Sequence, residues 1–332
     1  MPLWVVIALA YLFEFANGWT DAPNSIATVV STRVLRPLPA VLMAGVLNLV
    51  GALVVGTAVA KTIAEGIVDP SFVSLETVAA AVLAASLWAL SAQYFGLPSS
   101  ESHALVAGLI GAGFAAGGLR ALESAGTNAS LIGLVTSPLG GFIMGFLLMV
   151  VIYRVFVRVR RATVSKVFGK GQIVSAAFMA FSHGTNDAQK TMGVIALAIY
   201  LDNAGTIGTN APELTIELWM IVSAGIVMGI GTMVGGWRVV RTMGMRLTHL
   251  EPVQGFAAET SAATVITTAA TLGIPVSTTH AIGSAIMGVG ATRRLSAVRW
   301  GVAGQVVAAW ILTWPTCMVL GFVLQHLFSA LL

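Results

Sequence analysis

Residues 181–191 read Phe-Ser-His-Gly-Thr-Asn-Asp-Ala-Gln-Lys-Thr and place Asp187 and Lys190 inside a long apolar run. Charge is costly in such a run, since one such residue at the centre of a membrane-spanning helix costs roughly 2.5 to 3.5 kcal/mol on translocon scales. Ionisable residues at that depth usually face a partner, a cavity or a substrate path. The stretch therefore predicts a functional site inside a membrane protein.

The same pattern occurs earlier in the chain. Residues 15–25 read Phe-Ala-Asn-Gly-Trp-Thr-Asp-Ala-Pro-Asn-Ser, and the positions that match are Phe15, Gly18, Asp21 and Ala22 against Phe181, Gly184, Asp187 and Ala188. A second motif is also present twice: residues 96–104 read Gly-Leu-Pro-Ser-Ser-Glu-Ser-His-Ala, and residues 273–281 read Gly-Ile-Pro-Val-Ser-Thr-Thr-His-Ala. Two motifs in the same order in both halves indicate an internal duplication.

The composition points to the bilayer as the solvent. The 332 residues are 57% hydrophobic and 9% charged, with a mean hydropathy of +0.91, whereas soluble domains are about 25% charged. The single cysteine, Cys317, permits no intrachain disulfide and no cysteine-based metal site. The first apolar segment carries Glu14 and Asp21 and lacks a preceding basic region, so we expect a retained helix and not a cleaved signal peptide.

The sequence predicts an all-α integral membrane protein with about ten hydrophobic helical segments, each long enough to cross a hydrocarbon core of about 30 Å. The segments are residues 2–20, 38–60, 77–95, 99–119, 131–153, 172–200, 218–237, 253–272, 274–292 and 300–330.

The basic residues predict the orientation of these segments. When loops are assigned alternately, fourteen of the 17 basic residues fall on one side: Arg33, Arg36, Arg154, Arg158, Arg160, Arg161, Lys166, Lys170, Arg238, Arg241, Arg246, Arg293, Arg294 and Arg299. The opposite loops hold Lys61, Arg120, Glu65, Asp69, Glu76, Glu123, Asp202, Glu213 and Glu217. The positive-inside rule then puts both termini outside, and the sequence pI of about 9.6 reflects membrane orientation and not a nucleic-acid partner.

The basic run predicts where the halves divide. We expect a first repeat over residues 1–153, a cytoplasmic linker over residues 154–170 and a second repeat over residues 171–332. Five segments in each half is an odd number, so the second half is inverted relative to the first. Inverted repeats are typical of secondary transporters, whose sites lie near the bilayer midplane where interrupted helices expose backbone groups.

The two Gly-x-Pro connections predict interrupted or re-entrant helices. Residues 96–98 and 273–275 are short links between long apolar arms, and a proline there starts a new helix. The hydroxyls that follow would form an oxyanion cradle at a positive helix end: Ser99, Ser100 and Ser102, with Ser277, Thr278 and Thr279. The alternative is that they only pack helices, and their duplication beside duplicated aspartates favours the cradle. The sequence leaves open whether the turns lie at mid-membrane.

Asp21 and Asp187 cannot attract an anion, so at a substrate site they should bind the cation or proton that accompanies it. They would be the metal ligands if sodium is bound. Asn24 lies on roughly the same helical face as Asp21, and Lys190 is its counterpart in the second half, as a counter-charge for Asp187 or for substrate. In the alternative interpretation, neighbouring helices neutralise each aspartate and the charges are structural.

Other polar residues at depth carry weaker signals. His103, His183 and His280 are intramembrane histidines, which are more often hydrogen-bonded packing residues than ligands. Glu14, Glu101 and Glu259 are also at depth, and Glu259 either relays a proton or pairs within the bundle.

At the paired motifs the chain resembles the inorganic phosphate transporter (PiT) family, whose signature is a duplicated Gly-x-Asn-Asp-x-x-Asn-like sequence followed in each half by Pro-x-Ser-Thr-Thr-His. The first copy here departs at Thr20 and the second at Lys190. The resemblance covers essentially the whole chain. It implies an inverted-repeat symporter of inorganic phosphate, a site built from Asp21, Asn24, Asp187 and the hydroxyls of both hairpins, and a homodimer.

Members of this family use sodium or protons, some accept metal–phosphate complexes, and one branch resembles sulfate permeases. The aspartate motifs resemble the bacterial proton-coupled, low-affinity branch, and Lys190 argues against sodium. The resulting hypothesis is a bacterial inner-membrane importer, with no enzymatic activity and no cofactor besides a coupling cation. The alternatives are a sulfate permease, an anion channel, which would not need paired aspartates, and a Ser/His/Asp hydrolase, which the duplicated serines disfavour.

Overall fold

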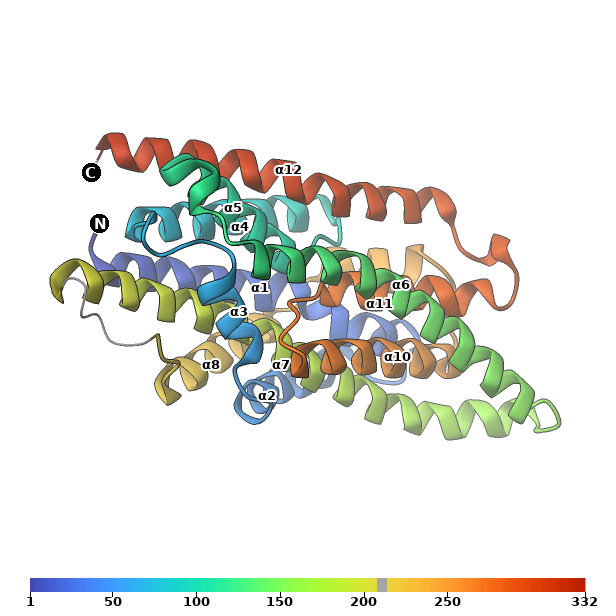
Figure 1. Ribbon diagram of the computed structural model, residues 1–332. Helices are drawn as coiled ribbons and strands as arrows, with labels where there is room; N and C mark the ends of the chain where they lie inside the picture. The colour runs from blue at the N-terminus through green and yellow to red at the C-terminus, as the bar shows by residue number, and fades with distance from the viewer. Residues whose placement is uncertain (208–213, 332) are drawn as a thin grey trace.

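The computed structural model describes residues 1–207 and 214–331, and in these residues the fold is all-helical (Figure 1). The α-helices are α1 (Leu3–Ser31), α2 (Pro37–Val54), α3 (Ala58–Gly66), α4 (Leu75–Phe95), α5 (Glu101–Gly117), α6 (Ser124–Val155), α7 (Arg161–Ile207), α8 (Leu218–Val234), α9 (Trp237–Arg241), α10 (Pro252–Thr271), α11 (Thr278–Ala291) and α12 (Trp300–Leu331). Glu213, which the charge pattern placed in an outer loop, lies outside the described residues.

The expected all-α membrane fold is confirmed, and each of the ten predicted segments contains a helix. By length and composition, six helices of the described chain can cross a membrane, or seven if a bent pair counts as one span. That pair is α8 with the residues 237–246, and it bends by 59° after Gly235, whose φ is 73°. A second break divides the predicted segment 38–60 into α2 and α3, at Gly56 with φ 84°.

The two Gly-x-Pro connections form matching turns. Gly96 and Gly273 adopt positive φ of 67° and 70°, a conformation that glycine reaches without the steric cost a Cβ would add. After each glycine the chain closes the preceding helix by a bond back to it, from the Leu97 N–H to the Ala92 carbonyl (2.9 Å) and from the Ile274 N–H to the Ala269 carbonyl (3.0 Å). The same local chemistry therefore ends α4 and α10.

These turns meet inside the protein. Figure 1 shows the α4–α5 and α10–α11 hairpins entering from opposite ends, with their turns near the middle of the molecule. The Ser102 hydroxyl donates to the Val276 carbonyl (2.8 Å), and the rings of His103 and His280 are 4.8 Å apart. The predicted re-entrant helices are confirmed, and the meeting of the turns favours the mid-membrane arrangement.

Close glycine contacts relate the two halves reciprocally. A Cβ at Gly111 of α5 would lie 2.0 Å from the carbonyl oxygen of Met318 on α12, and one at Gly288 of α11 would lie 2.2 Å from that of Phe142 on α6. The last helix of each half therefore packs against the hairpin of the other half. This exchange is what inverted repeats predict, and the boundaries at residues 154 and 170 stay predictions.

The same reciprocity holds for the aspartate-bearing helices. A Cβ at Gly18 of α1 would lie 2.3 Å from the Met228 carbonyl oxygen of α8, and one at Gly184 of α7 would lie 2.1 Å from that of Asn48 on α2. Glycine at these two matching positions lets α1 and α7 approach their neighbours at backbone distance, as is common in membrane helix packing. These contacts fix where Asp21 and Asp187 lie along the helix bundle, because each aspartate is one turn beyond its glycine.

Gly288→Ala is expected to destabilise the protein by about 1 to 3 kcal/mol, because the new methyl group must displace backbone in a packed interface. Gly304→Ala is the matched control, because Gly304 lies at an exposed position of α12 where a Cβ would meet nothing within 4 Å. Thermal unfolding of the purified protein in detergent measures both. Equal stability of the two variants would show that the α6–α11 interface accommodates the added methyl group without loss of stability.

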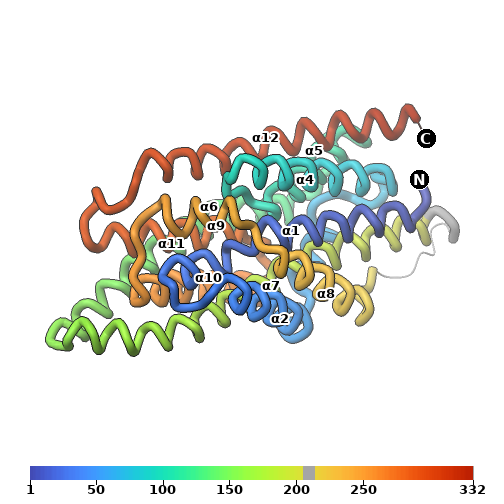
Figure 2. Tube along the Cα trace, turned by 180° about the vertical axis from the view of Figure 1, so that it is seen from behind, coloured from blue at the N-terminus to red at the C-terminus, as the bar shows by residue number. Residues whose placement is uncertain are grey.

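The ends of the molecule agree with the predicted parity. Figures 1 and 2 both show the N- and C-termini at one end, together with the C-terminal end of α7, while the α6–α7 connection lies at the opposite end. The basic residues 154–170 are thus separated from the termini by the full length of the bundle.

Candidate functional site

The two repeated aspartates lie side by side in the interior. The Nε2 atom of His183 lies 3.3 Å from Asp187 Oδ2 and 3.9 Å from Asp21 Oδ2. One ligand atom from each of these three residues falls within 4.8 Å of the others. His183 precedes Asp187 by one helical turn on α7, which puts both side chains on the face that meets α1.

The N-terminus of α11 covers both carboxylates. Thr279 donates its hydroxyl proton to Asp21 Oδ1 (2.9 Å), and the Thr278 hydroxyl lies 3.4 Å from an oxygen of each aspartate. The Asn24 amide then donates to both threonine hydroxyls, at 3.1 and 2.9 Å. Residues from the first Asp motif and the second hairpin are thereby joined in one network.

Lys190 links the second Asp motif to the first hairpin. Its ammonium lies 2.9 Å from Asp187 Oδ1 and donates to the Ser102 hydroxyl at 2.7 Å. The side chain is 0% exposed, so an uncompensated charge there would be prohibitive and the pairing with Asp187 is required. Asn186 adds a further donor to the same carboxylate oxygen, at 2.7 Å.

Three of the predicted serines make other bonds. Ser100 and Ser277 are the N-cap residues of α5 and α11, and their hydroxyls accept the backbone N–H of His103 (3.3 Å) and His280 (3.1 Å). Ser99 donates to Glu101 at 3.3 Å. The structure therefore groups Asp21, Asn24, Asp187, Lys190, Ser102, Thr278 and Thr279 directly, while a contact of Ser99, Ser100 and Ser277 with substrate stays a prediction.

Thr20 and Glu101, which were not among the predicted site residues, also belong to this region. Glu101, at the position equivalent to Thr278, accepts the hydroxyl of Thr20 at 2.8 Å. Thr20 and Glu101 each stand at a position where the first repeat differs from the second, and this difference is the signal that could have found them. His183 could have been found from its spacing to Asp187. In contrast, His280 stacks on Trp310 with ring centroids 4.1 Å apart, which agrees with a packing role, but neither ring nitrogen has the expected hydrogen-bond partner among the described residues.

Comparison with known proteins identifies the chain. The sequence pattern of the phosphate transporter family matches residues 17–321. The chain belongs to the phosphate transporter (PiT) family. Its relatives include a probable low-affinity inorganic phosphate transporter of Rhizobium meliloti, 45% identical over 320 residues that cover 96% of this chain and 94% of the relative. A protein of Bacillus subtilis with the same description is 39% identical and covers 98% and 97%.

A solved structure described as the sodium-dependent phosphate transporter matches 99% of both chains with a TM-score of 0.89 at 25% identity. The phosphate transporter described here is therefore a multi-pass membrane protein that carries inorganic phosphate and is not an enzyme. The family resemblance drawn from the paired motifs is confirmed.

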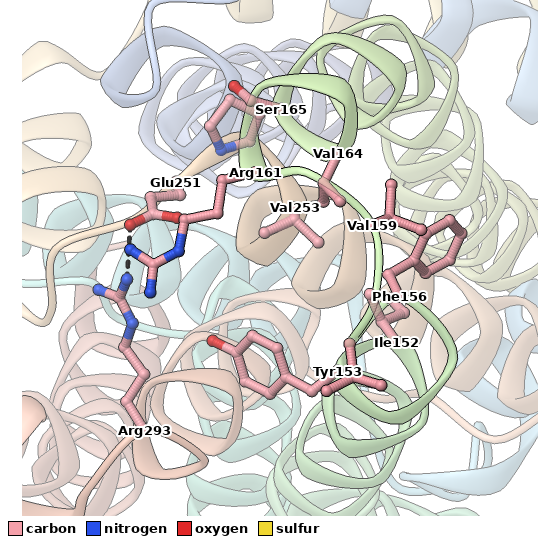
Figure 3. Close-up of a pocket in the computed structure, with 12 residues that line it drawn as sticks. Ile152, Tyr153, Phe156, Val159, Arg161, Val164, Ser165, Glu251, Val253 and Arg293 are labelled. Atoms are coloured by element: carbon pink, nitrogen blue, oxygen red, sulfur yellow. Dashed lines mark hydrogen bonds and ion pairs between the residues drawn. The ribbon is translucent and has the colours of Figure 1, made fainter.

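One surface cavity of the transporter lies away from this site. A cavity of about 500 Å³ opens where α6 and α7 meet the ends of α10 and α11, with Tyr153, Arg161 and Val253 among its lining residues (Figure 3). Arg293 and Glu251 form an exposed ion pair at its rim. The aspartate site, in contrast, is closed: Asp21 is 4% exposed and Asp187 is 0% exposed. A solute from either surface can therefore reach the aspartates only when helices of the transporter move apart.

Proposed function

We propose that this transporter imports inorganic phosphate into the bacterial cell by symport with protons, with sodium as the alternative coupling ion. The observation that carries the proposal is the ammonium of Lys190, fully buried and bonded to both Asp187 and Ser102. With Lys190, this transporter already holds one fixed positive charge at the point where the two repeats meet.

Electrostatics explains why a cation must accompany phosphate. Asp21 and Asp187 contribute two negative charges and Lys190 one positive charge, and the His183 imidazole beside the aspartates adds at most one more. The centre therefore has no surplus of positive charge with which to meet the anion. A buried ion that is not compensated costs several kcal/mol even after relaxation. A cation or proton therefore enters with each phosphate, and the aspartates are its natural acceptors.

The identity of the side chains favours protons. Hard cations take oxygen ligands, and the ligand cluster here contains the His183 imidazole and lies against the Lys190 ammonium. The ammonium repels a second cation next to Asp187. If sodium does bind, Asp21 and Asp187 are its ligands in this proposal.

Phosphate itself would bind at the facing ends of α5 and α11, where helix N-termini present free backbone N–H groups. Lys190, Ser102 and the two threonines of α11 would supply charge-assisted and hydroxyl bonds, with Ser99, Ser100 and Ser277 holding the helix starts. A metal–phosphate complex is compatible with the same site, since the aspartates would face the metal.

The test uses purified protein in liposomes, with labelled phosphate and labelled sulfate offered under separate proton and sodium gradients. We expect an inward proton gradient to drive phosphate accumulation, and neither a sodium gradient alone nor sulfate to support uptake. Accumulation driven by sodium alone would overturn the proton assignment, and downhill movement with no dependence on either gradient would indicate a channel.

The proposal includes the bacterial inner membrane, with both termini outside, and a homodimer, as the family resemblance implies. Cysteines placed at Arg160 and Glu217 in a Cys317→Ser background test the orientation in whole cells. An impermeant maleimide added outside should label position 217 and leave position 160 unlabelled until the cells are opened. Labelling of 160 alone would reverse the assignment of sides.

A further inference from the structure

A second buried polar group lies on α1, apart from the aspartate site. Glu14 precedes Asp21 by two helical turns, or roughly 10 Å along the axis, on the side of the termini. The Glu14 side chain is 0% exposed. Thr191 of α7 donates its hydroxyl proton to Glu14 Oε2 at 2.5 Å, while Glu14 Oε1 has no hydrogen-bond partner among the described residues.

Asn17, one turn further along α1, is equally incomplete. It is 0% exposed, and within the described chain neither its amide oxygen nor its amide nitrogen makes a well-formed hydrogen bond, although the amide lies near enough to act on the Glu14 carboxylate. A buried polar group without a partner costs about 1 to 3 kcal/mol, and natural proteins contain few. Three such atoms on two residues of one helix face mean that a further hydrogen bond can form between Glu14 and Asn17.

Not every buried acid in the protein is left this way, although Glu101 also has one oxygen, Oε2, without a hydrogen-bond partner among the described residues. Glu259 of α10 accepts hydrogen bonds on both oxygens, from Thr28 and Gln172 on one and from Ser175 on the other. The contrast shows that the fold can satisfy a buried carboxylate fully with its own side chains. At Glu14 it does so on one oxygen only.

The charges around Glu14 are few. From α7, Lys190 and Asp187 act on it electrostatically, and they are already paired with each other at 2.9 Å. The other helices packed against α1 here contribute little: α2 and α8 contain no Asp, Glu, Lys, Arg or His. The one acidic side chain of α4, Glu76, is bonded to the N-terminal amine, and Tyr94 lies at the other end of that helix. Tyr11 of α1 donates to Ser223 of α8. No partner charge is therefore dedicated to Glu14.

The geometry points to a proton-binding site formed by Glu14, Asn17 and Thr191, separate from the aspartates, that carries one coupling proton in addition to the cation or proton that the aspartates accept. The inference rests on the proton symport proposed above. A proton from the outer water adds to the Glu14 carboxylate and forms an O–H bond, which turns the unpartnered oxygen into a donor for the Asn17 amide oxygen three residues away. The same O–H bond breaks when the transporter opens inward, and the proton leaves to the cytoplasmic water.

A proton fits this group of atoms better than a metal ion. Hard divalent ions require about six oxygen ligands, whereas the described residues offer one carboxylate, one amide and one hydroxyl. The position also bears on coupling: the ionised Glu14 adds a negative charge near the Lys190 ammonium, which is paired with Asp187, and protonation of Glu14 removes that charge, so more of the ammonium's positive field acts on the phosphate anion. Proton loading would then prepare the substrate site two turns away.

The experiment compares Glu14→Gln, which mimics the protonated acid permanently, with Glu65→Gln, the same change on an exposed position of α3. In liposomes we expect Glu14→Gln to exchange phosphate against phosphate without a gradient, as the control does. We expect its accumulation under a gradient of one pH unit to fall about tenfold, because each coupled proton contributes about a factor of ten per pH unit.

Accumulation by Glu14→Gln equal to that of Glu65→Gln would overturn the inference, and loss of exchange in folded protein would place Glu14 in the phosphate site instead. If the wild type and the control ignore the pH gradient, the proposed function fails first, so the two failures are distinguishable.

Should Glu14→Gln not fold, Thr191→Val serves, because it removes the donor to the ionised carboxylate and keeps the side-chain shape. The pH of half-maximal uptake should then rise by about one to two units, the equivalent of one charge-assisted bond. An unchanged pH profile would overturn the inference.

Discussion

Asp187→Asn is expected to remove nearly all phosphate uptake while the protein still reaches the membrane. The change strips the negative partner from Lys190, which lies 2.9 Å from Asp187 and is fully buried. The variant also loses a charge-assisted hydrogen bond, worth about 1.5 to 3 kcal/mol, so uptake should fall roughly ten- to a hundredfold. Initial rates of labelled phosphate uptake in liposomes measure the loss.

Two further substitutions test whether both repeats build one site. Asp21→Asn loses the acceptor of the Thr279 hydroxyl, and Ser277→Ala loses the N-cap of α11, so each should lower uptake roughly ten- to a hundredfold. Ser86→Ala is the control, because that hydroxyl donates only to the Val82 carbonyl of its own helix. Full activity in either aspartate variant would mean that the carboxylate is structural.

Lys190→Asn is expected to raise the number of cations that enter with each phosphate by about one. Position 190 is the counterpart of Asn24 in the first repeat, so the variant restores the symmetry of the repeats and removes the tethered positive charge from Asp187. The uncompensated carboxylate then requires a mobile cation, since buried unpaired charge is so costly. The freed space is where sodium would be admitted.

Reversal potentials of the reconstituted wild type and variant give the ratio of charge to phosphate directly. Lys61→Asn, at an exposed position of α3, carries the same change of charge outside the bundle interior and should leave the ratio unaltered. A ratio that is identical in Lys190→Asn and the wild type would reduce Lys190 to a structural partner of Asp187.

The local chemistry of this fold could be predicted from the sequence. The duplicated Gly-x-Pro turns and the duplicated aspartates are local signals, because each motif is contained within a few consecutive residues. The structure has re-entrant hairpins at the Gly-x-Pro turns and brings the two aspartates together in one buried site. Serine and threonine after each proline likewise predicted helix starts. The sequence could not show that the hydroxyls of Ser100 and Ser277 would accept hydrogen bonds from their own helices. Which hydrogen bond a hydroxyl makes depends on the groups that face the turn.

Helix boundaries were harder to predict for a related reason. The apolar run of α7 was expected over residues 172–200, but the helix begins at Arg161, because the basic residues before it interrupt the hydropathy without interrupting the helix. The contact between Lys190 and Ser102 was also out of reach. It joins the two halves of the chain, and hydropathy carries no information about which faces of distant segments meet.

The exchange of helices between the halves has a consequence for synthesis. The α5 hairpin packs against α12, which is the last helix to leave the ribosome, and the contact is at backbone distance from Gly111 to Met318. At bacterial elongation rates of about 5 to 20 residues per second, the finished hairpin waits roughly ten seconds or more for that partner. During this time the face of α5 that packs on α12 has no protein neighbour, whereas the polar turn can already meet Lys190 and Val276, which are made earlier than α12. Until α12 arrives, that face of the nascent chain depends on the insertion machinery for cover. A chain that stops before Trp300 would be left with an exposed hairpin, as a substrate for membrane proteases.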